Sequence, residues 1–329
     1  MKYSKLGNSN LTVSAVTLGC MTFTGDANWG PQDEKDSIDT IRAALDAGIT
    51  SFDTAEGYAN GLTEEILAKA LGKDREKVVI MSKVSGGNLA KDDVIKACEN
   101  SLKRMKTDYI DLYQIHWPNY NIPVSETMEA LEILKEQGKI REIGVSNHGV
   151  KNLDEVLACS KVVSNQLAYN MLTRGIEYSI VPKCMENGIG ILTYSSLAQG
   201  LLTGKYMTPD SFPIDRARFK IFNNAKRTKA RHGLSGCEDE AFGAIAKIKA
   251  ICDEIGENMA DVALAWSLAQ PGITSVIAGA RTVEQAKTNA KGGNLELSAD
   301  IISELTKITE GVKAYIGDDA DPWAFGRIR

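Results

Sequence analysis

The chain of 329 residues has few of the side chains that bind metals and no long apolar run. Its three histidines, His116, His148 and His232, are far apart in sequence, so we expect no metal site. Six cysteines are scattered without a CxxC pair, which favours reduced thiols over a disulfide scaffold. No run reaches the roughly 18 apolar residues of a membrane helix, and no signal-peptide core follows Met1. We therefore expect a cytoplasmic protein with no membrane partner.

Several functional motifs are also missing. No Gly-x-Gly-x-x-Gly follows the first expected strand, which argues against a Rossmann domain. The sequence has neither a phosphate-cradling glycine-rich loop nor the nucleophile elbow of a serine hydrolase. The net charge of -5 argues against nucleic acid as a general partner.

A repeating unit is present instead. In residues 47–53, 137–146 and 187–194, a helix pattern ends in glycine and a short β-rich run follows at once. Glycine is favoured there because the residue after a helix often takes a positive φ. The same unit predicts strands near 16–19, 50–53, 78–82, 110–115, 140–145, 162–165, 189–193 and 273–277. It predicts helices near 33–47, 62–72, 91–105, 125–137, 149–158, 175–187, 238–254, 258–269, 282–290 and 299–312.

Strands that alternate with helices form right-handed units of a parallel sheet. Eight such units predict a (β/α)8 TIM barrel, with an open doubly wound sheet as the alternative. A turn cluster within residues 1–15 predicts an N-terminal β-hairpin, and an extra helix and a tail follow the last strand. No linker or low-complexity tract interrupts the chain, so we expect one domain over residues 1–329.

Reactive side chains follow the expected strands at their carboxyl ends, where a barrel of this type carries its active site. Asp53 ends the second strand, Lys83 the third and His116 the fourth, and Tyr58 lies in the loop after Asp53. Further polar residues or glycines follow the later strands, namely Ser146, Asn147, Gln166, Tyr194, Gly279 and Arg281.

The first four of these residues make a proton-transfer site if their strands are parallel neighbours. A free tyrosine titrates near pH 10, and a nearby ammonium is expected to lower the pKa of Tyr58. Asp53 would hold Lys83 charged, and His116 would either donate a hydrogen bond to a substrate oxygen or complete the proton path. Such a set suits protonation of the alkoxide that forms when a carbonyl is reduced.

Seven stretches, in order over nearly the whole chain, resemble the signature sequences of the aldo-keto reductases. They are residues 52–58, 80–83, 111–118, 144–147, 165–166, 194–206 and 277–281. The resemblance implies a (β/α)8 barrel that binds NADP(H), less often NAD(H), without a Rossmann domain. It also implies that Tyr58 is the general acid/base, that Lys83 and Asp53 tune it, and that His116 orients the carbonyl.

The resemblance further implies which residues bind the cofactor. Ser146, Asn147 and Gln166 would bind the nicotinamide amide, and Tyr194 would stack on the ring. The full expected set is Met21, Thr22, Asp53, Ser146, Asn147, Gln166, Tyr194, Ser195, Leu197, Gln199, Gly200, Lys205, Gly279, Arg281, Gln285 and Asn289. The substrate pocket is expected to contain Trp29, Tyr58, His116 and Trp117.

Arg281 is the candidate for the 2′-phosphate of NADP, because a guanidinium can clamp a phosphate with two hydrogen bonds. Gln285 and Asn289 lie four and eight residues further on, near the same face of the expected helix. Ala278 precedes Gly279 where many family members have proline, which leaves the preference between NADP and NAD open.

Two stretches have no assigned role. Residues 216–231 are basic and contain no acid, so they could cover the cofactor pyrophosphate, form a solvated loop or contact another subunit. The tail after Tyr315 contains Trp323 and Phe325 and, by resemblance, could wall the substrate pocket; a disordered acidic end is the alternative.

We therefore predict a reductase that transfers a hydride from NADPH to an aldehyde or ketone, including a sugar. Two alternatives stay open. One is an NAD-dependent sugar or glycoside oxidoreductase, and the other is a cofactor-sensing regulatory subunit like the β-subunit of potassium channels. The sequence is compatible with a homo-oligomer and does not identify the substrate or the direction of the reaction.

Overall fold

The computed structural model describes residues 1–26, 29–227, 229–323 and 326–329. Eight parallel strands form a closed barrel in which each strand pairs with the next and β10 pairs back with β3. The barrel strands are β3 (Val16–Gly19), β4 (Ser51–Asp53), β5 (Val79–Val84), β6 (Ile110–Ile115), β7 (Ile140–Ser146), β8 (Ser164–Ala168), β9 (Gly190–Tyr194) and β10 (Ile273–Gly279). The predicted (β/α)8 TIM barrel is confirmed, and the doubly wound sheet is excluded.

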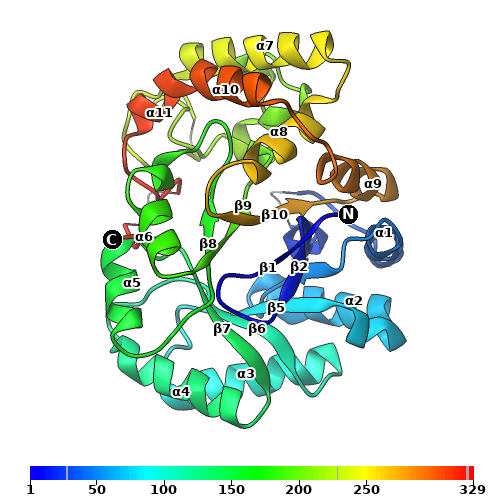
Figure 1. The fold of residues 1–329 in the computed structure, drawn as a ribbon, viewed down its shortest axis with the longest axis vertical. Helices are drawn as coiled ribbons and strands as arrows, with labels where there is room; N and C mark the ends of the chain where they lie inside the picture. The colour runs from blue at the N-terminus through cyan, green and yellow to red at the C-terminus, as the bar shows by residue number, and fades with distance from the viewer. Residues whose placement is uncertain (27–28, 228, 324–325) are drawn as a thin grey trace.

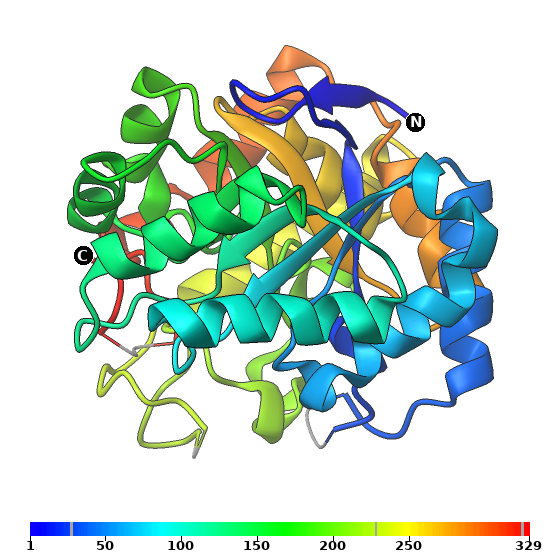
Figure 2. The same ribbon diagram turned by 90° about the horizontal axis from the view of Figure 1, so that it is seen from below.

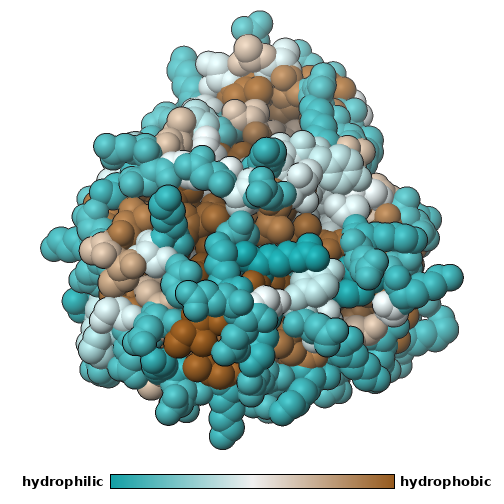
Figure 3. Space-filling model, turned by 60° about the horizontal axis from the view of Figure 1, so that its bottom comes forward, coloured by the Kyte–Doolittle hydropathy of each residue, from teal (hydrophilic) through white to brown (hydrophobic). Residues whose placement is uncertain are grey.

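Helices surround the barrel on its outside (Figure 1). They are α1 (Glu34–Asp46), α2 (Leu62–Leu71), α3 (Lys91–Met105), α4 (Val124–Glu136), α5 (Val150–Leu157), α6 (Ile180–Glu186), α7 (Glu238–Glu254), α8 (Met259–Leu268), α9 (Val283–Gly292), α10 (Ala299–Ile308) and α11 (Glu310–Ile316). Their apolar faces and the outer faces of the strands form one continuous buried core. The outer face in Figure 3 is mostly hydrophilic, with hydrophobic side chains in separate patches.

Local sequence explains where several elements begin and end. The carboxylate of Asp33 accepts a hydrogen bond from the backbone N–H of Lys35 at 2.7 Å and caps α1. Gly48 and Gly138 follow helices with φ of 88° and 72°, a conformation that costs other residues more. These glycines turn the chain directly into β4 and β7, which brings the ends of both strands to the same side of the barrel.

The N-terminal hairpin of β1 (Tyr3–Lys5) and β2 (Thr12–Ser14) is present as predicted. Leu6, Leu11 and Val13 pack against side chains inside the barrel, including Met81 and Leu112. The hairpin lies at one end of the barrel, and loop residues 205–227 and 229–235 lie at the opposite end (Figure 2). The hairpin therefore closes one end with apolar contacts and leaves the carboxyl ends of the strands for the site.

Three predicted elements need correction. The sixth strand is Ser164–Ala168 rather than 162–165, since its last residues pair with β9 up to Tyr194. The helix expected over 175–187 is a short 3₁₀ turn followed by α6, which begins at Ile180 and carries Pro182 in its first turn. The helix expected over 299–312 breaks at Thr309, whose buried hydroxyl accepts a hydrogen bond from Arg174 at 3.1 Å.

Three further observations concern the described part of the chain. There, no helix is long and apolar enough to cross a membrane. No group of three or more His, Cys, Asp or Glu side chains within the described ranges is placed to hold a metal ion. All six cysteines are free, and Cys159 is the exposed one among them.

Candidate active site

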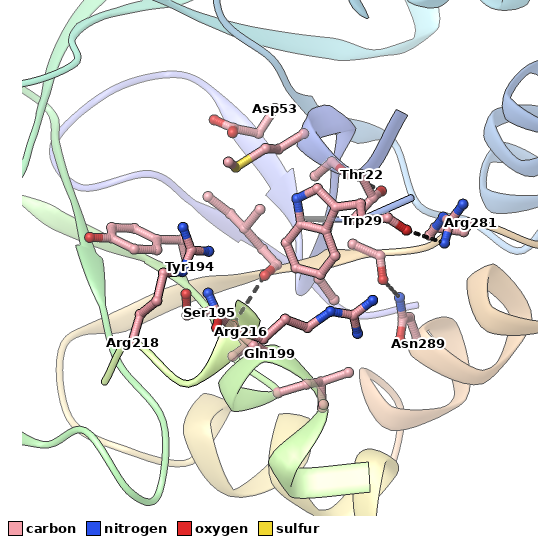
Figure 4. A pocket seen from close by; sticks show the side chains of 18 of the residues that line it. Thr22, Trp29, Asp53, Tyr194, Ser195, Gln199, Arg216, Arg218, Arg281 and Asn289 are labelled. Atoms are coloured by element: carbon pink, nitrogen blue, oxygen red, sulfur yellow. Dashed lines mark hydrogen bonds between the residues drawn. The ribbon is translucent and has the colours of Figure 1, made fainter. Parts of the chain in front are cut away.

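A cavity of about 840 Å³ opens at the carboxyl ends of the barrel strands. Its wall contains every residue expected to bind the cofactor or the substrate. These are Met21, Thr22, Trp29, Asp53, Tyr58, His116, Trp117, Ser146, Asn147, Gln166, Tyr194, Ser195, Leu197, Gln199, Gly200, Lys205, Gly279, Arg281, Gln285 and Asn289. The structure thus brings side chains from most of the barrel together around one space, part of which is shown in Figure 4.

Lys83 lies beneath the cavity wall and is fully buried. Its Nζ donates to Oδ1 of Asp53 at 2.6 Å, to the carbonyl oxygen of Thr54 at 2.8 Å and to the hydroxyl of Tyr58 at 3.2 Å. The second carboxylate oxygen of Asp53 accepts from Nε2 of Gln166 at 2.8 Å. Three groups around the ammonium therefore accept a hydrogen bond from it, and one of them is the phenol that faces the cavity.

The electrostatics of this group differ from the expectation in one respect. Burial raises the pKa of Tyr58 and outweighs the opposing charge of Lys83, so the predicted net lowering of this pKa is wrong. Burial also acts to lower the pKa of Lys83, but Asp53 and Tyr58 outweigh it and leave that pKa raised. The resting pair is accordingly a neutral phenol beside a charged ammonium.

His116 completes the group from the end of β6. Its ring lies edge-on to the ring of Tyr58, with 5.6 Å between the centroids. Burial and the charge of Lys83 lower the pKa of His116 to about 3. The imidazole is therefore neutral near pH 7 and presents a neutral N–H donor rather than a second cation.

The ends of β7 and β8 contribute a cluster of amide and hydroxyl groups. Asn147 has a positive φ of 61° and donates through Nδ2 to the carbonyl oxygen of His116 at 3.0 Å. The hydroxyl of Ser146 donates to the carbonyl oxygen of Gln166 at 2.9 Å. Asn and Asp tolerate positive φ better than most residues, so the chain can turn at Asn147 and aim its amide at the site.

Tyr194 joins this cluster from the end of β9. Its hydroxyl donates to Oδ1 of Asn147 at 2.9 Å and accepts from the indole Nε1 of Trp323 at 3.1 Å. Trp323 belongs to the tail and forms part of the cavity wall at the end where Tyr194 lies. Phe325, the other aromatic residue singled out in the tail, lies outside the described residues.

Arg281 and α9 lie at the opposite end of the cavity from Tyr194 (Figure 4). The guanidinium donates to the carbonyl oxygens of Trp29 and Pro31, both at 2.5 Å, and to the side chain of Gln32 at 2.9 Å. Asn289 donates to the carbonyl oxygen of Gly279 at 3.1 Å. This end of the cavity thus combines a cation with the N-terminus of a helix that begins at Val283.

The structure adds lining residues that the sequence did not assign. Arg216, Arg218, Lys229 and Arg231 of the basic stretch face the cavity, while Lys220 and Arg227 are buried away from it. The composition of the stretch was the available signal, but it did not distinguish a cavity wall from a solvated loop.

The barrel carries a phenol, an ammonium and an imidazole at one end of a cavity lined by cations. It therefore belongs to the class of (β/α)8 proteins with an acid–base site at the carboxyl ends of the strands. The chain belongs to the aldo/keto reductase family, whose model matches residues 15–310.

Relatives in the family resemble the chain over nearly its full length. It is 35% identical to an aldo-keto reductase, YhdN, of Bacillus subtilis, over 98% of this chain and 97% of the relative. It is 32% identical to the NADH-specific methylglyoxal reductase of Escherichia coli, over 94% and 100%. The crystal structure of a Klebsiella pneumoniae aldo/keto reductase in complex with NADP and acetate matches with a TM-score of 0.74 and 29% identity, over 94% and 96%.

Proposed function

We propose that this protein reduces a small aldehyde or ketone with a nicotinamide cofactor and that Tyr58 donates the proton. The observation that carries the proposal is the position of the Lys83 ammonium, which contacts both the Asp53 carboxylate and the Tyr58 hydroxyl at the cavity wall. Family membership supports the oxidoreductase class.

Each of the four acid–base residues has its own role in the proton transfer. Tyr58 rests as a phenol because burial raises its pKa, so it holds a proton to give. When the carbonyl oxygen gains negative charge, the phenolic proton moves to it, and the phenolate that remains lies 3.2 Å from the Lys83 ammonium. Asp53 keeps that ammonium charged, since the two groups form a buried ion pair. The neutral imidazole of His116 donates a hydrogen bond that orients the substrate oxygen.

The lining of the cavity fits a nicotinamide dinucleotide. Amide and hydroxyl groups of Ser146, Asn147 and Gln166 match a carboxamide, and the ring of Tyr194 offers a stacking surface. Arg281 offers a planar cation for a phosphate at the other end, and its present partners are neutral oxygens. The Klebsiella relative is in complex with NADP, which supports NADP(H) as the cofactor here. Another relative is NADH-specific, so NAD(H) is tested as well. When bound, the cofactor supplies the hydride.

The proposal is tested by mixing the purified protein with NADPH or NADH and a panel of aldehydes, and following loss of reduced-cofactor absorbance. Turnover with NADPH supports the proposal. Turnover with NADH alone, mainly on sugars, supports the NAD-dependent alternative. Tight cofactor binding with no turnover of any aldehyde in either direction would contradict the enzymatic proposal and favour the regulatory alternative. A cytoplasmic location and a homo-oligomer stay predictions.

A further inference from the structure

The charged side chains on the cavity wall are strongly unbalanced. The lining residues with a positive charge are Lys205, Arg216, Arg218, Lys229, Arg231 and Arg281. Asp53 is the lining carboxylate within the described residues, and Lys83 already pairs with it. The whole protein has a net charge of -5, so the excess of cations here is local. A site of this kind attracts anions.

Arg218 differs from the other cations in its surroundings. Its guanidinium lies over the indole ring of Trp323, with 5.1 Å from Cζ to the centroid. Its Nε is buried and has no hydrogen-bond partner in the described part of the protein. Its Nη2 lies 2.8 Å from the side chain of Gln199, which accepts from it when the amide is turned to satisfy both groups. Burial lowers the pKa of Arg218; the charge of Asp26 opposes this lowering, and the charge of Arg231 adds to it.

Arg218 lies at the same end of the cavity as Tyr194. Figure 4 shows Arg218 and Tyr194 on one side of the cavity and Arg281 and Asn289 on the other. Contacts also connect Arg218 with Tyr194, because Trp323, which lies under Arg218, donates to the hydroxyl of Tyr194 at 3.1 Å. Tyr194 in turn contacts Asn147, which donates to the backbone of His116. Arg218 is therefore placed at the Tyr194 end of the cavity, away from the end assigned to the adenosine phosphate.

Trp323, which lies under Arg218, is held in place by Phe219 and by the rest of the tail. The ring of Trp323 stacks on Phe219, with 5.1 Å between centroids and 26° between planes. Further on, the carbonyl oxygen of Arg329 accepts from the backbone N–H groups of Lys151 and Asn152 at 2.9 and 3.2 Å. The tail is thus held on both sides of the site, which keeps the indole beneath the guanidinium.

We propose that Arg218, supported by Trp323, forms a subsite that binds a carboxylate or phosphate group of the substrate. The preferred substrates are then aldehydes or ketones that carry such a group. A buried guanidinium edge with an unpaired N–H is suited to a charge-assisted hydrogen bond to such a group. The indole face stabilises the cation and restricts its rotation. The proposal rests on the proposed carbonyl reduction and adds the class of substrate.

Matched substrates test the subsite. The measurement is kcat/KM for 4-carboxybenzaldehyde against its methyl ester, and for glycolaldehyde phosphate against glycolaldehyde. We expect the anionic member to be preferred by roughly tenfold or more, and Arg218→Gln to reduce that ratio to within about threefold of one. The two pairs distinguish a carboxylate substrate from a phosphate substrate. Equal kcat/KM values within both pairs in the wild type, with clear turnover, would overturn the subsite and leave the proposed function intact.

Arg231→Gln is the matched control, since Arg231 lines the same cavity but is exposed. Its charge is screened by solvent, so the substrate ratio should fall much less than in Arg218→Gln. Equal losses in the two variants would mean that the general potential of the cavity, and not the Arg218 subsite, sets the preference.

A binding measurement decides the question without turnover. Benzoate should change the tryptophan fluorescence of the wild type, benzamide should not, and both Arg218→Gln and Trp323→Phe should lose the response. A benzoate response that survives in Arg218→Gln would overturn the subsite. If no aldehyde is reduced at all, this titration still tests the subsite, so its failure and that of the proposed function can be told apart.

Discussion

Lys83 and Asp53 form an ion pair in which Nζ lies 2.6 Å from Oδ1, and the two side chains are 0% and 4% exposed. Removing one member of a buried pair leaves the other charge without compensation. We expect Lys83→Met to lower the free energy of unfolding by about 3–5 kcal/mol, measured by urea denaturation. The double variant Lys83→Met/Asp53→Leu should recover part of this loss. A single variant as stable as the wild type would contradict the buried-pair description.

His148 is expected to make the protein less stable at acidic pH. Burial lowers the pKa of His148 to about 4, and the residue is 2% exposed. An unfolded histidine binds a proton below about pH 6.5, so the unfolded state gains protons before the folded state does. The free energy of unfolding should therefore fall by about 1.4 kcal/mol per pH unit as the pH drops from 6.5 toward 4, from this residue alone.

His148→Asn supplies the comparison for this pH effect. Urea unfolding at several pH values should show a shallower loss of stability with acid in the variant than in the wild type. The same slope in both proteins would place the acid sensitivity elsewhere in the chain.

Arg281 is expected to select the phosphorylated cofactor. Arg281→Met should weaken NADPH binding by roughly 10- to 100-fold and change NADH binding little, because NADH lacks the 2′-phosphate. Arg281→Lys should restore only part of the affinity, since an ammonium cannot form the two parallel hydrogen bonds of a guanidinium. Tryptophan fluorescence titration with both cofactors measures this, and equal losses for NADPH and NADH would remove Arg281 from the assignment.

Gly149 leaves no room for a side chain beneath the tail. An added Cβ would lie 2.2 Å from the carbonyl oxygen of Arg329. Gly149→Ala should displace the end of the tail and make the peptide bond after Arg327 more sensitive to trypsin. Gly243→Ala is the control, because nothing lies within 4 Å of its added Cβ. Equal trypsin sensitivity in the two variants would argue against the contact.

Much of the fold and of the acid–base group was predictable because both depend on local pattern. Glycines such as Gly48 mark helix ends, and short β-rich runs after them place Asp53 and His116 at strand ends on one side of a barrel. The break at Thr309 was not predictable, because it depends on a hydrogen bond from Arg174, far away in sequence.

The same reasoning explains which contacts within the site were not predicted. Trp323 lies 129 residues from Tyr194, and only the folded tail brings the two together. Arg218 became identifiable once its support by Trp323 was known. The raised pKa of Tyr58 was missed because burial, which outweighs the charge of Lys83, is a property of the folded protein.

The proton donor is the central claim, and Tyr58→Phe tests it most directly. The variant should bind NADPH with nearly unchanged affinity and lose about 10²- to 10⁴-fold in kcat for aldehyde reduction. Tyr178→Phe, at a tyrosine that is 48% exposed, should behave as the wild type. A Tyr58→Phe protein that keeps close to full turnover would contradict the assignment of Tyr58 as the acid.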